Sequence, residues 1–184
     1  MCIRLVKRLS ALCAVSALAL CGAGVQAATQ GSLGATSQGS VSISASVPSR
    51  ARITGLTDVA FTNQDPGTAA SNAQDVCVWS NTATNAYTVT ATGNGTASAF
   101  TLSNGTTTVP YSVAWASSSG QTSGTALTTG TASASLTSTA THQTCVSGPA
   151  ASASLVIGIS TADLSTMSAG SSYTGALTVL ITPQ

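Results

Sequence analysis

The chain has 184 residues, of which 43% are hydrophobic, 4% aromatic and only 5% charged, with a formal net charge of +1. This length suits one domain, and so small a charge excludes the basic patch that nucleic-acid-binding proteins use. All four acidic residues are Asp and only one His is present. The sequence therefore offers neither a carboxylate pair of the glycosidase type nor a His placed for nucleophilic catalysis.

The first 27 residues, MCIRLVKRLSALCAVSALALCGAGVQA, have the organisation of a secretory signal peptide. A basic start is followed by an apolar run from about Leu9 to Leu20 and by small residues up to Ala27. No later stretch approaches the roughly 20 apolar residues that a membrane span needs. We expect export and cleavage after Ala27. Lipid attachment at Cys21 is the alternative, but Leu20 stands where lipoprotein signals need a small residue.

Removal of residues 1–27 leaves 157 residues with a formal charge of −2, no Lys and no Glu. These residues include 27 Ser and 30 Thr. Thr is β-branched and suits strands, whereas Ser favours caps and turns over helix interiors. The mature chain is therefore expected to be β-rich.

The mature chain begins with a lead rich in Gly, Ser, Thr and Gln, from Ala28 to Gln38, followed by the stretch QGSVSISASVP. Apolar and polar residues alternate without interruption from Val41 to Val47, which predicts a half-buried strand, and Pro48 ends it. We treat residues 28–48 as an N-terminal extension and residues 49–184 as the β domain. A strand at a chain terminus can pair within its own domain or with another chain.

Short segments with strand periodicity follow, separated by Gly, Asn, Ser and Pro turns. The predicted strands are Arg52 to Ile53, Val59 to Phe61, Val76 to Trp79, Ala86 to Thr92, Ala99 to Leu102, Val109 to Trp115, Thr125 to Leu127, Ala132 to Leu136, Ala151 to Ile159 and Tyr173 to Ile181. The tract from Ala116 to Ser135 is low in complexity and is predicted to be a loop with weak edge strands. Thr161 to Ser168 is predicted to be a turn or one helical turn. Many short strands with regular turns indicate an all-β sandwich or barrel.

Cys77 and Cys145 are the two cysteines that remain after signal-peptide removal. An exported protein enters an oxidising compartment, so one disulfide is predicted between them. Closing a loop of about 68 residues stabilises the fold by about 4 kcal/mol in the chain-entropy account. Two buried free thiols or a metal site are the alternatives, and the single His argues against a metal. Trp79 lies two residues from Cys77, so both side chains leave one face of the strand.

The remaining polar and aromatic residues give little evidence of chemistry. His142 is predicted to lie in a loop or on the surface, and the Asp residues are predicted to serve turns and caps. The aromatic residues can form either a sugar-stacking surface or part of the core, and their alternation with aliphatic neighbours favours the core; they are Trp79, Tyr87, Tyr111 and Trp115. We expect no enzyme activity, no cofactor and no metal.

The order of these features resembles subunits of chaperone-usher pili, most closely the archaic Csu-type and spore coat protein U-like group. The matching segments are TSQGSVSISASVP near the N-terminus, DVCVWSNTATNAYTVTATGNG in the middle and AGSSYTGALTVLITPQ at the end. The chain departs from the group at one point. The group commonly has a Cys after the first strand that pairs with the Cys of the DVCVWSN segment, but here Arg50, Ala51 and Arg52 occupy that place and Cys145 is the available partner.

The resemblance implies an incomplete immunoglobulin-like β-sandwich that lacks its last strand and is completed by donor-strand exchange. It implies a periplasmic chaperone, an outer-membrane usher and other identical or related subunits as partners, and an extracellular pilus that supports surface attachment and biofilm formation. In the donor strand, Val41, Ile43, Ala45 and Val47 are the inserted side chains, and Gly39 allows close backbone approach at its start. Leu177, Val179 and Ile181 line one wall of the receiving groove.

Two other functions remain open at this point. One is a complete secreted β-sandwich that binds carbohydrate through its aromatic residues. The other is a coat or matrix protein of similar fold that does not polymerise by strand exchange.

Overall fold

The computed structural model describes residues 27–184. The expected signal peptide, apart from Ala27, lies outside the described residues. The chain divides into two units, with the boundary between Ser46 and Val47. The second unit contains every strand of three sheets and one short helix, and its all-β character confirms the fold class predicted from the sequence.

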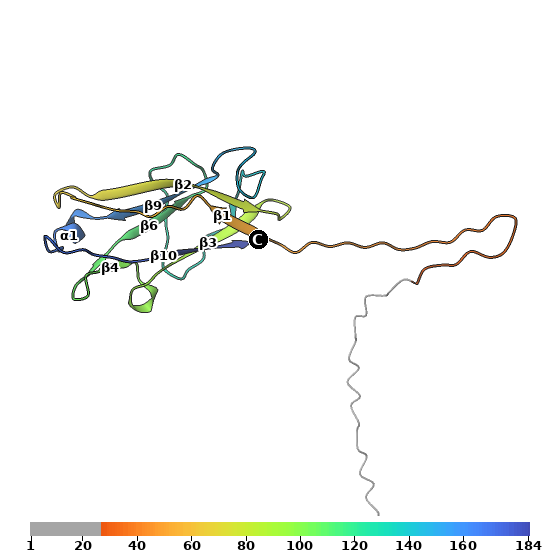
Figure 1. Ribbon diagram of the computed structural model, residues 1–184, viewed down its shortest axis with the longest axis horizontal. Helices are drawn as coiled ribbons and strands as arrows, with labels where there is room; N and C mark the ends of the chain where they lie inside the picture. The colour runs from red at the N-terminus through yellow and green to blue at the C-terminus, as the bar shows by residue number, and fades with distance from the viewer. Residues whose placement is uncertain (1–26) are drawn as a thin grey trace, which may run out of the picture. The chain divides into compact units, whose positions relative to one another are not determined.

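The strands are short, and turns and loops connect them (Figure 1). Their bounds are β1 Ala51–Thr54, β2 Ala70–Ser80, β3 Ala86–Gly93, β4 Thr101–Ser103, β5 Thr108–Pro110, β6 Ser112–Ala116, β7 Thr125–Ala126, β8 Leu136–Thr137, β9 Ala153–Ile159 and β10 Leu177–Pro183. A 3₁₀ turn spans Thr96–Ser98, and the helix α1 spans Thr161–Leu164, where one helical turn was expected. Ser160 caps α1 by accepting a hydrogen bond from the Asp163 amide, as a Ser N-cap does.

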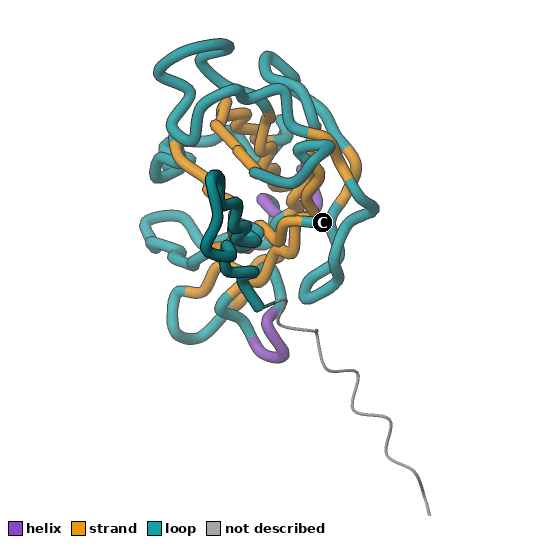
Figure 2. Tube along the Cα trace, turned by 90° about the vertical axis from the view of Figure 1, so that its right-hand side faces the viewer, coloured by secondary structure: helices purple, strands orange, loops and turns teal. Residues whose placement is uncertain are grey.

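Two antiparallel sheets form the sandwich. One sheet has the order β1-β2-β9-β6-β7, the other has the order β10-β3-β8, and β4 and β5 form a separate two-stranded ribbon. In the view of Figure 2 the strands lie at the centre and the loops surround them. Consecutive strands are frequently in different sheets, so the sandwich is held together by contacts between distant parts of the sequence.

The core contains the alternating positions that the sequence singles out. Tyr87, Val89 and Ala91 of β3 are fully buried, and Trp115 of β6 is 3% exposed. Trp115 and Tyr87 belong to opposite sheets, and the indole Nε1–H donates to the Tyr87 hydroxyl at 3.3 Å. This bond gives the buried indole N–H its partner and links the two layers. Burial raises the pKa of the Tyr87 phenol, and the indole bond lowers it to a smaller extent.

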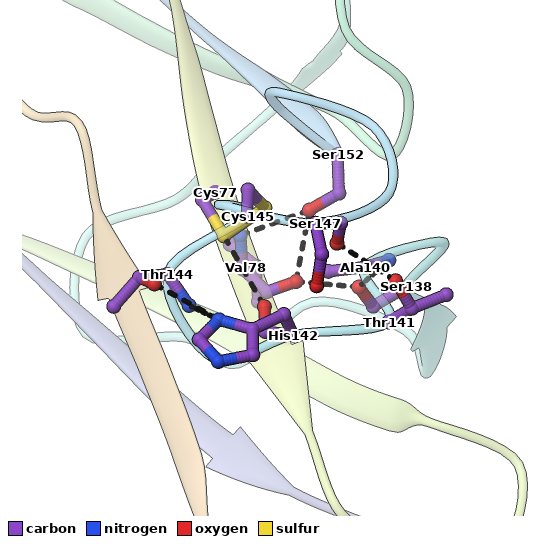
Figure 3. Close-up of a disulfide and its surroundings, with 10 residues drawn as sticks. All are labelled: Cys77, Val78, Ser138, Ala140, Thr141, His142, Thr144, Cys145, Ser147 and Ser152. Atoms are coloured by element: carbon purple, nitrogen blue, oxygen red, sulfur yellow. Dashed lines mark hydrogen bonds between the residues drawn. A yellow bond between two sulfur atoms is a disulfide. The ribbon is translucent and has the colours of Figure 1, made fainter.

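The predicted disulfide is confirmed: Cys77 and Cys145 are bonded, with a Cα–Cα distance of 5.9 Å. It lies apart from the main core, in a small cluster with Ala140 against which Trp79 packs. Val78, between Cys77 and Trp79, faces the main core instead. The sandwich therefore uses its disulfide to fasten a loop to the outer face of β2, which the sequence alone did not indicate (Figure 3).

The loop that carries Cys145 is also bonded to the backbone of β2 on both sides of the disulfide. The Ser152 hydroxyl donates to the Val78 carbonyl at 2.8 Å and accepts from the Val78 amide at 2.9 Å, and the Ser138 hydroxyl donates to the same carbonyl (Figure 3). The backbone groups of Val78 are thereby satisfied beyond the end of β9.

Several predicted strands differ from the observed ones. Val59 to Phe61 is not a strand, and β2 begins six residues before the predicted Val76. The first half of β2, ASNAQD, lacks apolar alternation, and all of its side chains except that of the buried Ala70 are exposed or half-buried. The predicted strand Val109 to Trp115 divides at Tyr111 into β5, which pairs with β4, and β6, which pairs with β9. Alternation of apolar and polar residues identifies which face of a strand is buried. It does not identify the strand with which each part of the segment pairs.

Two further strands are displaced along the sequence. The predicted Ala99 to Leu102 becomes β4, which starts at Thr101 because the 3₁₀ turn precedes it. The predicted Ala132 to Leu136 is reduced to β8 at Leu136–Thr137 and a single bridge between Ala132 and Thr90. The Ser/Thr-rich tract thus contributes only β7 and isolated contacts, as its composition indicates.

Candidate strand-acceptor edge

The strands β1 and β10 form one lateral edge of the sandwich. Each pairs with a single neighbour among the described strands, β1 with β2 and β10 with β3. The two strands contact one another, yet no hydrogen bond joins them in the part of the chain that the structure describes. We call this side, made of β1 and β10, the open edge.

The register of β10 determines which backbone groups face the open edge. The Asn94 amide donates to Ala176 and the Gln184 amide donates to Ala86, at 3.2 and 3.1 Å. Hydrogen-bonded and non-hydrogen-bonded pairs alternate along an antiparallel ladder, so the even-numbered residues of β10 bond to β3. The odd-numbered residues point their backbone groups outward; they are Leu177, Val179, Ile181 and Pro183.

The same residues direct their side chains at the core. Leu177, Val179 and Ile181 are half-buried and pack against the main core cluster, whereas the alternate residues Thr178 and Leu180 are exposed. The apolar row predicted for one face of this strand is therefore present. Its incomplete burial leaves apolar surface beside unpaired backbone groups, which is the condition of an unprotected sheet edge.

The opposite wall of the open edge is shorter. Asn81 donates its amide proton to Arg50 at 3.1 Å, so the same alternation directs the backbone groups of Ala51 and Ile53 away from β2. Ile53 is half-buried against the main core. The open edge thus combines two outward residues on β1 with three amide-bearing residues on β10.

The distance between β1 and β10 is smaller than the distance between two strands that flank a third strand in a sheet. Cα atoms of β1 and β10 come within 8 Å of each other, whereas the two strands that flank a central strand are separated by about 9.5 Å. A strand that enters between them has to move them apart there by at least about 1.5 Å.

The first unit, described from residue 27 to residue 46, contains the predicted donor strand except for Val47, which begins the second unit. Every residue from 27 to 50 is exposed, with Val41 at 71%, Ile43 at 89% and Val47 at 84% of full exposure. Residues 41–47 belong to no strand of the described chain. The predicted strand therefore does not form within this single chain.

A lone bridge precedes that stretch. The backbones of Thr29 and Ser40 exchange two hydrogen bonds of 3.0 Å. A Cβ at Gly39 would lie 2.9 Å from the Thr29 carbonyl oxygen, so glycine is required for this approach. In the predicted donor strand, Gly39 allows close backbone approach at the strand's start. The structure gives it a close approach inside the extension itself.

Three of the predicted donor residues lie in the first unit, whereas Val47 lies in the second unit with the predicted acceptor residues, and each unit is described by itself. Val41, Ile43, Ala45 and Val47 are exposed, and Leu177, Val179 and Ile181 are half-buried. Their roles as donor and acceptor stay predictions.

The aromatic side chains lie inside the protein rather than on a binding surface. Tyr87, Tyr111 and Trp115 are buried, and Trp79 is half-buried against the disulfide cluster. Burial also raises the pKa of Tyr111, whose hydroxyl donates to the Ala176 carbonyl at 3.2 Å. A pocket of about 420 Å³ opens near Trp115, but with that indole 3% exposed it offers no ring face for a sugar.

Asp75 has a structural role that sequence reasoning missed. Its Oδ1 accepts from the Gly120 amide at 2.7 Å and from the Ser154 hydroxyl at 2.6 Å. These two hydrogen bonds, of which the one from Ser154 is the stronger influence, lower the pKa of the carboxyl below its usual value. Asp75 thus holds the loop that leads to β7, whereas turn and cap roles fit Asp65 and Asp163.

The other candidate residues show no constellation for chemistry. His142 lies half-exposed in a loop and bonds through Nδ1 to Thr144 at 2.9 Å (Figure 3). Within residues 27–184 no three His, Cys, Asp or Glu side chains come together as a metal site. No helix among the described residues is long and apolar enough to cross a membrane.

Comparison with known proteins supports the fold. No protein-family model and no curated protein matches the chain. A solved structure described as "Chaperone-tip adhesin complex is vital for synergistic activation of CFA/I fimbriae biogenesis" superposes with a TM-score of 0.51 at 15% sequence identity. The alignment covers 73% of this chain and 41% of the chain in the solved structure. This chain therefore spans less than half the length of the chain that it matches. The likeness is one of fold: the chain is an all-β sandwich similar to that found in a fimbrial chaperone-adhesin complex.

Proposed function

We propose that the chain is a structural subunit of an extracellular chaperone-usher pilus of the Csu-type or spore coat protein U-like kind. Each subunit gives residues Val41–Val47 to the open edge of another subunit. A periplasmic chaperone covers the open edge before assembly, and an outer-membrane usher exchanges the chaperone for the next subunit. The role is structural rather than catalytic, needs no cofactor, and supports surface attachment and biofilm formation.

The match between the open edge and the extension carries this proposal. The open edge has outward amides on Leu177, Val179 and Ile181 beside half-buried apolar side chains. The extension has a seven-residue alternating stretch with exposed apolar side chains, and β10 is also seven residues long. If the extension adds to the open edge as a strand, its backbone pairs with the outward amides of β10. Its alternate apolar side chains then enter the core beside the half-buried row.

The energies are sufficient for a durable contact. Burial of Val41, Ile43 and Val47 contributes about 1.5 to 3 kcal/mol each, and each ladder hydrogen bond adds about 1 kcal/mol net. Together they give on the order of 10 kcal/mol before the cost of ordering the extension. A head-to-tail contact of this kind does not close on itself and so produces a filament. The fold likeness to a fimbrial chaperone-adhesin complex supports the same assignment.

Electrophoresis of surface filaments tests the proposal. Filaments heated mildly in detergent should run as a ladder of multimers that collapses to monomer on boiling, because strand exchange is non-covalent and slow to reverse. Deletion of residues 28–47 should abolish the ladder. Monomer under both conditions, or normal filaments from the deletion variant, would contradict the proposal.

A pair of charge substitutions separates the inserted face from the other face of the extension. Ile43→Asp places a carboxylate on the inserted face, where burial without a partner costs several kcal/mol. We expect loss of the ladder. Ser44→Asp places the same charge on the opposite face and should leave the ladder intact. Equal effects of the two substitutions would contradict insertion of the Val41 to Val47 face.

No observation favours the two other functions. The aromatic residues that a carbohydrate-binding site needs are buried or half-buried. A coat or matrix protein that does not exchange strands has no use for an exposed alternating stretch, and the ladder distinguishes it from a pilus subunit directly.

A further inference from the structure

The point where the extension joins the sandwich is held by one side chain. Asn81, the residue after β2, accepts from the Arg50 amide through Oδ1 at 2.6 Å and donates from Nδ2 to the Pro48 carbonyl at 2.9 Å. Its backbone amide donates to the Arg50 carbonyl at 3.1 Å. Residues 48–50 are therefore held to Asn81, just past the last β1–β2 pair at Ala51 and Ser80.

The first residue of β1 and the last residue of β10 lie at the same end of the sandwich. Ala51 pairs with Ser80 at the end of β2, and the Gln184 amide donates to Ala86 at the start of β3. The turn between β2 and β3 joins these points, since Thr82 Oγ1 accepts from the Ala86 amide at 2.8 Å. Figure 1 shows the C-terminus beside the start of β1. The strands β1 and β10 therefore run in opposite directions.

Self-insertion of the extension antiparallel to β10 is excluded by length. In that orientation the inserted strand runs parallel to β1, so Val47 ends beside Leu177, six residues of rise or roughly 20 Å from the start of β1. Four residue steps join Val47 to Ala51 and span at most about 14 Å. The chain is too short to return.

Self-insertion parallel to β10 requires a hairpin whose turn consists of residues 48–50. Such a turn breaks the hydrogen bond from Asn81 Nδ2 to the Pro48 carbonyl and the one from the Arg50 amide to Asn81 Oδ1. The loss of these two hydrogen bonds disfavours the hairpin. The fold thus resists each of the two ways in which the extension can enter its own open edge.

We propose that Asn81 and the three-residue connection Pro48–Arg50 are a positioning device that forces strand donation to be intermolecular. This inference rests on the proposed function, and it makes a second copy of this chain, or a related subunit, the obligatory recipient of Val41–Val47. A subunit that could fill its own edge would be a closed monomer and would terminate assembly. Asn81 is a positioning residue, because it acts through the direction of the chain and not through contact with the recipient.

An insertion experiment tests the length argument. Eight Gly and Ser residues are inserted between Val47 and Pro48 of the full chain, which leaves the bonds of Asn81 in place and extends the reach by about 26 Å. A short flexible connection gives an effective concentration on the order of mM, far above that of other subunits at µM. We expect a compact monomer by size exclusion and at least a roughly tenfold loss of the multimer ladder.

The matched control is the same eight-residue insertion between Thr36 and Ser37, upstream of the donor stretch. It adds the same mass and flexibility without lengthening the connection to β1, so it should polymerise like the unaltered chain. Polymer formation by the Val47 insertion variant at the level of this control would overturn the inference. Absence of a ladder from the unaltered chain and the control would instead overturn the proposed function, and the inference with it.

Substitution of Asn81 tests the second route. Asn81→Ala removes both side-chain bonds and should raise the monomer fraction severalfold. Asn81→Asp retains the acceptor for Arg50 but loses the donor to Pro48, and should give an intermediate fraction. Circular dichroism separates these outcomes from unfolding. A folded Asn81→Ala variant with an unchanged monomer fraction would show that Asn81 does not set the direction of the extension.

Discussion

The sandwich has two lateral edges, and they are built differently. The edge opposite the open one consists of β7 and β8, each two residues long, joined to their sheets by irregular contacts. Along it the Gly130 and Ser133 amides donate to Ala91 and Val89 of β3, outside any regular strand. Very short and irregular edge strands are a common protection against pairing with other chains. The open edge presents instead the seven continuous residues of β10.

The contrast shows where the chain places its capacity to bind other chains. We call the edge made of β7 and β8 the protected edge. Ser, Thr and Gly dominate the sequence from residue 116 to residue 135 and allow only short strands there. Leu177, Val179 and Ile181 give the open edge apolar side chains and outward amides together. The same sandwich thus prevents strand addition on one side and permits it on the other.

Proline substitutions at the two edges should give the largest difference. Val179→Pro removes an outward amide without loss of a ladder bond to β3, so we expect a folded subunit that forms no multimer ladder. Ala126→Pro removes the equivalent outward amide of β7, because the Leu127 amide is the one that bonds to Val113. That variant should polymerise normally.

A third proline variant controls for damage to the strand itself. The Leu180 amide bonds to β3, so Leu180→Pro should lower the thermal midpoint more than Val179→Pro does. Loss of the ladder in Ala126→Pro, or its retention in a folded Val179→Pro variant, would contradict the distinction between the two edges.

Removal of the disulfide should have the next largest effect, on stability rather than on assembly. The bond between Cys77 of β2 and Cys145 closes a loop of 68 residues. Its loss should reduce the free energy of unfolding by about 4 kcal/mol. Denaturant titration of a Cys77→Ser, Cys145→Ser double variant against the oxidised unaltered chain measures this, and the reduced unaltered chain should resemble the double variant. A change below about 1 kcal/mol would contradict a stabilising role.

The hydrogen bond between Trp115 and Tyr87, which joins the two sheets, should contribute less. Tyr87→Phe leaves the buried Trp115 Nε1–H without its acceptor, which should cost about 1 to 3 kcal/mol. Tyr111→Phe removes a donor to the Ala176 carbonyl, an exposed residue whose carbonyl also accepts from Asn94, so its cost should be smaller. Denaturant midpoints of both variants check the order, and the reverse order would contradict it.

The smallest expected effect concerns pH and the loop that leads to the protected edge. The pKa of Asp75 is lower in the folded chain than its ordinary value of 3.8. Its stabilising contribution is therefore complete above about pH 3.8 and is lost as pH falls through the lower folded pKa. The thermal midpoint of Asp75→Asn should lie below that of the unaltered chain near neutral pH, and the gap should close in acid. A gap that does not depend on pH would contradict this role.

The sequence predicts the buried faces of this fold better than the partners of its strands. Alternation at Tyr87, Val89 and Ala91 identifies core positions because a strand with one buried face has a period of two. The same alternation in Val109 to Trp115 does not reveal that the chain changes neighbours at Tyr111. Pairing depends on distant residues, which local periodicity does not record.

The sequence predicts only part of the candidate site, because the rest depends on contacts between residues that are far apart in the chain. The half-buried row Leu177, Val179 and Ile181 follows from the pattern of β10. The protection of the other edge and the role of Asn81 depend on contacts between residues far apart in the chain, such as Asn81 and Pro48. Asn81 follows Trp79 and Ser80 in the DVCVWSN segment, but no local signal indicates that its side chain holds residues 48 and 50.

Amide hydrogen exchange, compared between assembled and monomeric full-length chain, tests the central claim most directly. Thr178 and Leu180 should be protected in both forms, because their amides bond to β3. Leu177, Val179 and Ile181 should exchange rapidly in the monomer and slowly in the assembly, together with alternate amides of residues 41–47. Rapid exchange of Val179 and Ile181 in the assembled form would contradict strand donation to the open edge.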